Sequence, residues 1–186
     1  FKIVTLAASL GPGNLSPSTT FNCPGYWDGL GEANRKRCWL ETGHGELTLK
    51  QGLTASCNVV FYNAGTALHK VAPDTLSSFG KAFGFGEETG IASLSEAGGL
   101  MPDPAWKLDV YQESWSTGDT VNLSIGQGYL LVTPVQVARM VSAVANGGNL
   151  YRPYVVARIE AGEADQPETV TRASVEGQLP ISEAHL

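Results

Sequence analysis

The sequence predicts an α+β fold in which helices dominate. Five segments have the features of helices, whereas strand composition is limited to one run near the carboxyl-terminal end and a short piece around Ile91. Hydrophobic residues make up 42% of the 186 positions and charged residues 16%, which supports a packed core and argues against a disordered chain. The length suits one domain or part of a larger one.

The first part of the chain is expected to contain three helices and one long loop. The helices are predicted over 1–10, 47–55 and 59–69. Gly11-Pro12-Gly13 ends the first helix, and Thr48 is a candidate amino-terminal cap for the second. Residues 14–45 are rich in turns and carry two of the three cysteines. Such a long loop is uncommon in a compact domain unless it is functional or cross-linked.

The second part is expected to alternate helices with loops. Helices are predicted over 74–83 and 134–145, loops over 84–104 (with a short strand around Ile91) and 109–128, and a strand over 150–159. The helix over 134–145 has the clearest signals, since Pro134 suits a first turn and Gly147-Gly148 ends the helix. Its apolar stripe is expected at Val137, Val141 and Val144. The acidic end over 161–186 forms a hairpin or lacks order.

The charge balance limits the classes of function. With 12 basic and 18 acidic residues the net charge is −6, and no stripe of lysine or arginine offsets it. Binding to nucleic acid is therefore not expected. The longest apolar run, residues 3–10, is too short to span a bilayer, and no signal peptide is visible.

The tripeptide Ser56-Cys57-Asn58 lies between two predicted helices. In an extended connection, alternate side chains face opposite ways, so Ser56 and Asn58 are expected to share a face while Cys57 points away. A hydroxyl beside an amide can pass a proton and orient a substrate carbonyl. The tripeptide alone is weak evidence for a functional site, because Ser-x-Asn also occurs by chance at turns and caps.

Further motifs along the chain support a functional interpretation of the tripeptide. The motifs are Gly43-His44-Gly45-Glu46-Leu47-Thr48, Phe61-Tyr62, Trp115-Ser116-Thr117-Gly118-Asp119-Thr120, Ile125-Gly126-Gln127-Gly128, Thr133-Pro134-Val135-Gln136 and Ala145-Asn146-Gly147-Gly148. In this order and spacing, the chain closely resembles the transpeptidase domain of class B penicillin-binding proteins, most of all the elongation-specific type, penicillin-binding protein 2. The resemblance covers about Phe1 to Val156.

The resemblance implies a partial active site. The family's first motif is Ser-x-x-Lys, and Phe1-Lys2 followed by an apolar helix matches its end. Lys2 is then the motif lysine, and the nucleophilic serine falls three residues earlier, outside this chain. Ser56 and Asn58 match the second motif, Ser-x-Asn. The third, Lys-Thr-Gly, is absent from these 186 residues. We therefore expect the chain alone to be inactive.

Each matched residue has a role in the family's chemistry. A serine hydroxyl needs a base, and a lysine one helical turn after it can act as that base when held away from water. Ser56 would relay the proton to the leaving amine, and Asn58 would hold both Lys2 and the substrate carbonyl. The implied fold is the penicillin-binding transpeptidase (serine β-lactamase-like) fold, with helices on both faces of an antiparallel sheet. Residues 1–186 would form a partial domain, mainly its helical part.

Four further residues form a candidate zinc site. Cys23, Cys38, His44 and Cys57 include every cysteine in the chain, and three thiolates with an imidazole suit tetrahedral zinc. Some relatives of penicillin-binding protein 2 are similar in having zinc in this region. A Cys23–Cys38 disulfide, favoured in an oxidising compartment, and three free thiols stay open as alternatives. A Cys57 nucleophile with His44 as its base is a weaker one.

The resemblance implies peptidoglycan D,D-transpeptidation through an acyl-enzyme that β-lactams also form. Peptidoglycan stem peptides, β-lactams and a RodA-type glycosyltransferase are the expected partners. The expected location is the extracytoplasmic face of the bacterial cytoplasmic membrane, with an anchor that is not in this chain. The alternatives are a serine β-lactamase or β-lactam sensor domain of related fold, and a non-catalytic homologue stapled by zinc.

Overall fold

The computed structural model describes residues 1–92, 94–161 and 168–186 of the chain. Its α-helices are α1 (Lys2–Leu10), α2 (Leu49–Thr54), α3 (Asn58–Val71), α4 (Thr75–Ala82), α5 (Pro104–Tyr111), α6 (Thr117–Leu123) and α7 (Pro134–Ala145). Short 3-10 turns cover Glu32–Asn34 and Glu183–His185. The strands are β1 (Thr20–Cys23), β2 (Tyr26–Trp27), β3 (Lys36–Arg37), β4 (Gly45–Thr48), β5 (Asn149–Tyr151), β6 (Arg158–Ile159), β7 (Thr169–Val170) and β8 (Val175–Gln178). Helices thus dominate, as the sequence predicts.

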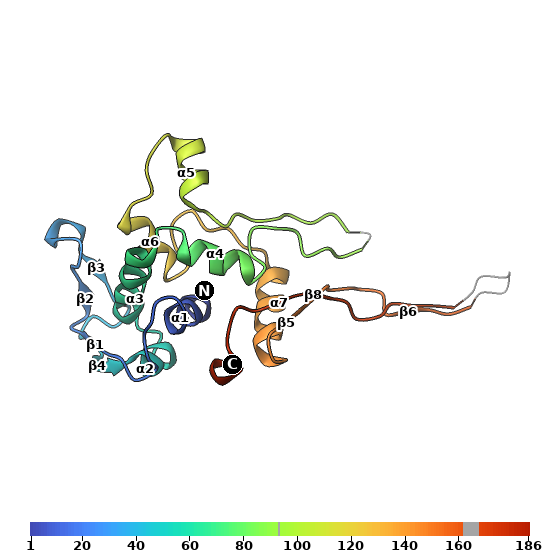
Figure 1. Cartoon of the computed structure of the whole chain (residues 1–186), viewed down its shortest axis with the longest axis horizontal. Coiled ribbons are helices and arrows are strands. Elements are labelled where there is room, and N and C mark those ends of the chain that lie inside the picture. The colour runs from blue at the N-terminus through green and yellow to red at the C-terminus, as the bar shows by residue number, and fades with distance from the viewer. Residues whose placement is uncertain (93, 162–167) are drawn as a thin grey trace.

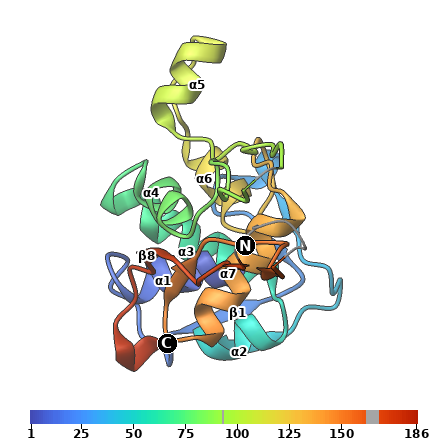
Figure 2. The same cartoon turned by 90° about the vertical axis from the view of Figure 1, so that its right-hand side faces the viewer.

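A helical body surrounds α1. Helices α3 and α4 both pack against α1, and α6 packs along α3 (Figures 1 and 2). Gly65 allows α3 and α6 to approach closely, since a Cβ atom there would lie 2.7 Å from the Cβ of Ser124. Thr5 of α1 donates a buried hydrogen bond of 2.7 Å to the carbonyl of Ser124. The end of α6 is therefore fitted to α1 and α3 together.

Five of the seven helices match the predictions, and α5 and α6 were missed. Helix α6 lies inside the loop predicted over 109–128, and that part of the prediction is wrong. Helix α5 overlaps only the edges of the two predicted loops and covers residues 105–108, for which no element was predicted. Helix α5 starts with Pro104 after an Asp103 cap, and α6 starts with a capping box formed by Ser116 and Asp119. These start signals were present, but neither helix repeats apolar residues over enough turns to be detected by periodicity. Helix α5 projects from the body in Figure 2.

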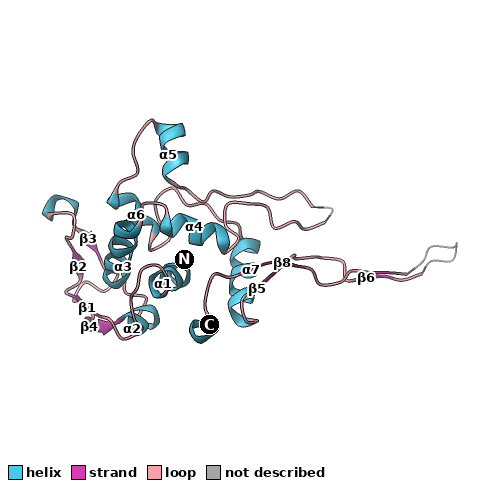
Figure 3. Ribbon diagram, viewed as in Figure 1, coloured by secondary structure: helices cyan, strands magenta, loops and turns pink. Residues whose placement is uncertain are grey.

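Across residues 1–92, 94–161 and 168–186, the strands form four antiparallel pairs. Figure 3 shows how short these strands are beside the helices. In the turn-rich region, β1 pairs with β4 and β2 with β3, which gives residues 14–45 more order than the sequence indicates. The strand predicted over 150–159 is divided into β5 and β6, with Pro153 between them. β5 pairs with β8 and β6 with β7, so the described part of the acidic end forms a hairpin arm. No strand is present at Ile91; residue 93 lies outside the described residues.

Two clusters of buried side chains make up the core. One joins α1, α4 and α7 around Leu68, Phe83 and Met140. The other joins β1, α2 and α3 around Phe61, and it includes all three cysteines. The predicted valine stripe of α7 is wrong at two of its three positions, whereas Val144 is half-buried and packs against the first cluster. Val137 and Val141 are exposed, and the helix buries Gln136, Met140 and Ala143 instead.

Gln136 explains that orientation. Its side-chain amide donates to the carbonyls of Glu87 and Gly98 at 2.6 and 2.8 Å, and its oxygen accepts from the amide of Thr133. Gln136 is almost fully buried and ties the two ends of the 87–98 loop to α7. A buried polar residue thus takes a place where an apolar one was expected.

Among the residues that the structure describes, no helix has the length and apolar character needed to cross a membrane.

The close approach of α3 and α6 can be tested with matched glycine variants. In Gly65→Ala the new methyl group would press on the side chain of Ser124, so the free energy of unfolding should fall by about 1–3 kcal/mol. In Gly118→Ala on α6, the nearest atom lies at an ordinary 3.4 Å, and the change should stay within about 0.5 kcal/mol. Chemical denaturation of the intact protein measures both. Equal effects of the two variants would contradict this packing.

Candidate functional site

The three residues predicted to be catalytic meet at the start of α1. The Lys2 Nζ atom lies 2.7 Å from the Asn58 Oδ1 atom, 3.1 Å from the Ser56 Oγ atom and 2.6 Å from the Ser56 carbonyl oxygen. More than 50 residues of chain separate Lys2 from its partners. The sequence motifs therefore converge on one site, as the resemblance implies.

The backbone places these side chains by a different route from the one expected. Ser56 has a φ of 50°, in the left-handed region, so the predicted fully extended connection is wrong. Cys57 is extended and caps α3, and Asn58 is the first residue of that helix. Ser56 and Asn58 nevertheless both face Lys2, while Cys57 points toward the other cysteines.

Lys2 lies in a partly dry environment. Burial lowers the pKa of its ammonium group, and the nearby sulfurs of Cys38 and Cys57 oppose part of that shift. The ring of Phe61 lies 5.6 Å from the Lys2 Nζ atom. A lysine with a lowered pKa gives up its proton more readily, which is what a general base requires.

The four predicted metal ligands also converge. The ligand atoms of Cys23, Cys38, His44 and Cys57 all lie within 4.8 Å of one another. The His44 Nδ1 atom is 3.5 Å from the sulfur of Cys23 and 3.6 Å from that of Cys38, and the sulfurs of Cys38 and Cys57 are 3.9 Å apart. The three cysteines are buried.

These separations fit a tetrahedral zinc ion. With Zn–S bonds of about 2.3 Å and Zn–N bonds of about 2.0–2.1 Å, tetrahedral angles place two sulfurs about 3.8 Å apart and a sulfur and a nitrogen about 3.6 Å apart. The distances from His44 to Cys23 and Cys38, and that between Cys38 and Cys57, agree with these values. The spacing of the four residues along the chain is unlike a zinc finger, so the agreement comes from the fold.

The thiols have an environment that needs a cation if they ionise together. Burial raises the pKa of Cys57 to about 12, and the sulfurs of Cys23 and Cys38 add to the rise. Burial acts on Cys38 in the same direction, but hydrogen bonds from the backbone N–H groups of Leu40, Asn58 and Val59 and from Cys23 outweigh it and lower the pKa. Several thiolates in one buried pocket repel one another, and a divalent cation would remove that repulsion.

Two of the alternatives for these residues fare less well, whereas three free thiols agree with the structure. All three cysteines are free, so the structure contains no Cys23–Cys38 disulfide. A Cys57 nucleophile is disfavoured because its raised pKa keeps the thiol protonated. The second ring nitrogen of His44 is buried and has no hydrogen-bond partner among the described residues.

The two groups of residues share a short piece of backbone. Cys57 lies between Ser56 and Asn58 in the chain, so the thiol cluster and the Lys2 contacts are held by the same turn. The Asn58 Nδ2 atom also lies 3.5 Å from the carbonyl oxygen of Arg37, the residue before Cys38. The position of the cysteine-bearing loop therefore bears on the orientation of Asn58.

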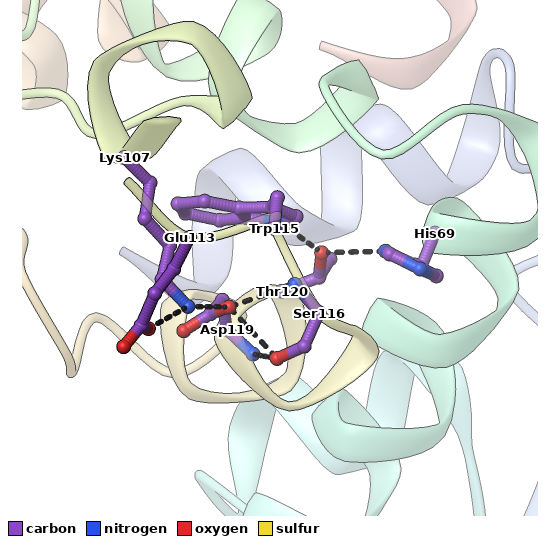
Figure 4. Close-up of polar contacts among 7 residues, drawn as sticks. All are labelled: His69, Lys107, Glu113, Trp115, Ser116, Asp119 and Thr120. Carbon is purple, nitrogen blue, oxygen red and sulfur yellow. Dashed lines mark hydrogen bonds and ion pairs between the residues drawn. The ribbon is translucent and has the colours of Figure 1, made fainter. Parts of the chain in front are cut away.

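A polar network between α5 and α6 was missed by the sequence analysis (Figure 4). Lys107 of α5 is almost fully buried and donates to the Asp119 carboxylate at 2.8 Å, and Glu113 lies 3.5 Å away. The Asp119 carboxylate also accepts from the amide and hydroxyl of Ser116. Burial alone would raise the pKa of Asp119, but the bonds from Lys107 and Ser116 lower it. The capping-box pattern at 116–119 was the available signal.

Comparison with known families gives a match over the whole chain. Residues 1–186 match the family described as penicillin binding protein transpeptidase domain. Among curated proteins, the chain is 37% identical over 146 residues to the peptidoglycan D,D-transpeptidase MrdA of Haemophilus influenzae, covering 78% of the chain and 22% of that protein. It is 35% identical over 183 residues to stage V sporulation protein D of Bacillus subtilis, covering 98% and 25%.

Among solved structures, the chain is likewise similar to penicillin-binding proteins. The chain is similar to penicillin-binding protein 2 of Pseudomonas aeruginosa, at 29% identity with a TM-score of 0.80, covering 99% of the chain and 38% of that structure. It is also similar to penicillin-binding protein 2 of Helicobacter pylori, solved as a complex with MreC, at 31% identity with a TM-score of 0.76, covering 91% and 30%. The chain thus spans about a quarter of the curated relatives it matches.

Proposed function

The chain belongs to the penicillin-binding protein transpeptidase family, and from this premise we propose that the intact protein is a peptidoglycan D,D-transpeptidase. Its serine would attack the D-Ala–D-Ala bond of a stem peptide and release D-Ala. The acyl-enzyme would then pass to an amine on a neighbouring strand. β-Lactams would acylate the same serine. This chain alone, without the serine and the Lys-Thr-Gly motif, would be inactive.

One observation carries the proposal: the Lys2 Nζ atom contacts both Ser56 and Asn58. These are the lysine of the first motif and the two polar residues of the second. A serine one helical turn before Lys2 would share the same face of α1 and lie within reach of the amine. A structural lysine at the end of a helix has no need of this arrangement.

The contacts also suggest a path for the proton. Lys2 as an ammonium donates to three acceptors, and two of them, the Ser56 carbonyl and the Asn58 side-chain oxygen, can only accept. The Ser56 hydroxyl can also donate. When Lys2 is neutral, Ser56 can turn its proton toward the amine. Ser56 is therefore the partner suited to move a proton between Lys2 and the leaving amine, while Asn58 holds Lys2 in place.

We also propose that Cys23, Cys38, His44 and Cys57 hold a structural zinc ion. All four places would be filled by protein ligands, which is typical of structural rather than catalytic zinc. The ion would neutralise the buried thiolates and fasten the cysteine-bearing loop to the start of α3. Its effect on the reaction would come through the backbone of Ser56 and Asn58.

The proposed setting follows the relatives. An enzyme of this kind would act at the extracytoplasmic face of the cytoplasmic membrane, held by an anchor outside this chain, beside a RodA-type glycosyltransferase. MreC is a further candidate partner, because the Helicobacter pylori relative was solved with it. Stem peptides and β-lactams are the proposed small ligands.

Covalent labelling of the intact protein by a fluorescent penicillin tests the function. We expect a long-lived adduct, formed at least about a hundredfold more slowly in Lys2→Ala because the general base is lost. Ser56→Ala should slow release of the leaving group and lower transpeptidation. Lys50→Ala, at an exposed lysine of α2, is the matched control and should label normally.

Three other outcomes of the labelling would point elsewhere. Rapid release of the adduct would indicate a serine β-lactamase. A stable adduct without cross-linking of a donor and an acceptor peptide would indicate a sensor domain. No labelling at all would leave a non-catalytic homologue stapled by zinc.

The acylation rate should depend on pH through Lys2. A neutral amine accepts the serine proton, so the rate should fall as the pH drops through the Lys2 pKa and protonates the amine. Because burial lowers that pKa, the midpoint of the rise should lie below the ordinary lysine value of about 10.4. Acylation constants of the intact protein between about pH 5 and pH 10 measure it. A midpoint at the ordinary lysine value would contradict the role of Lys2 as a base.

Metal analysis tests the thiol site. Protein purified without chelator should contain about one zinc per chain, and the three cysteines should be reduced. His44→Ala should bind zinc at least about tenfold more weakly and unfold at a lower temperature, since a ligand of the folded state is lost. His185→Ala, in the exposed carboxyl-terminal turn, is the control. Metal-free protein with a Cys23–Cys38 disulfide would overturn the assignment.

A further inference from the structure

Lys36 of β3 makes a contact that neither the motifs nor the thiol site requires. Its Nζ atom donates to the Asn122 Oδ1 atom of α6 at 2.8 Å, and the contact is partly buried. Lys36 precedes Arg37, whose carbonyl oxygen faces Asn58. Strand β3 has two residues, and within the described part of the chain its one pairing partner is β2. Backbone pairing alone gives such a short strand little hold on its position.

Helix α6, which carries the Asn122 partner of Lys36, is itself held in place by several hydrogen bonds. Figure 4 shows Asp119 bonded to buried Lys107, and Thr120 bonded both to the Trp115 indole at 2.8 Å and to the His69 Nδ1 atom at 2.9 Å. The indole can only donate, so the hydroxyl of Thr120 accepts from it, and the same hydroxyl makes the contact with His69. These bonds hold the first turn of α6 to α3 and α5, and Asn122 follows in the next turn.

The carbonyl of Arg37 selects one orientation of the Asn58 side chain. It accepts from the Asn58 Nδ2 atom and from the Tyr62 hydroxyl, both at 3.5 Å. With the amide nitrogen turned to this carbonyl, the amide oxygen faces the Lys2 ammonium at 2.7 Å. A reversed amide would set donor against donor at Lys2. Contacts of 3.5 Å are at the long limit for hydrogen bonds, so a small shift of β3 would lose them.

We propose that Lys36 is a positioning residue for the transpeptidase reaction. Its hydrogen bond to Asn122 fixes the position of β3. The Arg37 carbonyl on that strand then orients the Asn58 amide toward Lys2. The inference rests on the proposed function. Among the described residues, the side-chain hydrogen bond of Lys36 goes to Asn122 and not to Lys2, Ser56 or Asn58. Its effect passes through one hydrogen bond and one backbone carbonyl.

A double-mutant cycle in the intact protein tests this role. The variants are Lys36→Met, Asn122→Leu and the two combined, with Lys50→Met as control, and the probe is a fluorescent penicillin. We expect Lys36→Met to lower the acylation step by roughly tenfold, less than the hundredfold loss that a misplacement of about 1 Å can cause, with little change in initial penicillin binding. Asn122→Leu should act alike, and the combined variant should be no slower than either.

Two further measurements separate positioning from a loss of folding. Lys36→Arg keeps a donor for Asn122 and should recover most of the acylation rate. Zinc content and melting temperature should stay near those of the unmutated protein in every variant.

Each contrary result has a distinct meaning. Unchanged acylation in Lys36→Met, while the unmutated protein is labelled, would overturn the positioning role alone. Losses that multiply in the combined variant, or that track a fall in zinc content, would also overturn it. If the unmutated protein is not labelled, the proposed function fails first.

Discussion

The contact between Lys2 and the turn at Ser56 and Asn58 is the constraint on which the rest of the structure depends. It joins the first residue of α1 to the first residue of α3, and the two helices pack along each other from that point. A lysine in a partly dry site is costly unless each of its protons has a partner. The carbonyl and hydroxyl of Ser56 and the oxygen of Asn58 supply three partners. Ser56 turns both its carbonyl and its hydroxyl toward Lys2, and its backbone adopts the strained left-handed conformation to do so.

That strained turn has little support from ordinary packing on its outer side. The long region before α2 contributes only two-residue and four-residue strands, and its buried side chains are few. Three cysteines fill the space that larger apolar residues would otherwise occupy. Buried thiols pack as small hydrophobes, but they fix the backbone firmly only when they are cross-linked or bound to metal. Cys57 belongs to the thiol cluster and also lies between Ser56 and Asn58. The state of the thiols therefore affects the backbone that positions these two residues.

The sequence predicted the helices with repeated apolar spacing. It also singled out two sets of residues that the structure brings together, Lys2 with Ser56 and Asn58, and Cys23 with Cys38, His44 and Cys57, because short motifs and ligand types can be matched directly. It did not predict α5 and α6, which start with good caps but are too short for periodicity to show. It also placed Val137 and Val141 inward, whereas α7 turns Gln136 inward to hold the carbonyls of a loop almost 50 residues away. Such long-range partners are set by tertiary contacts, and local pattern carries no record of them.

Helix α6 explains how elements so far apart in the chain keep one geometry. The carbonyl of Ser124 receives the Thr5 hydroxyl of α1, one turn after Lys2. Gly65 brings α3 against the same residue, and Asn122 receives Lys36 of β3. Three elements thus contact the same short helix, α6. They are the helices that carry Lys2 and Asn58 and the strand that faces Asn58. Their relative placement therefore depends on contacts with α6 and not only on the long stretches of chain between them.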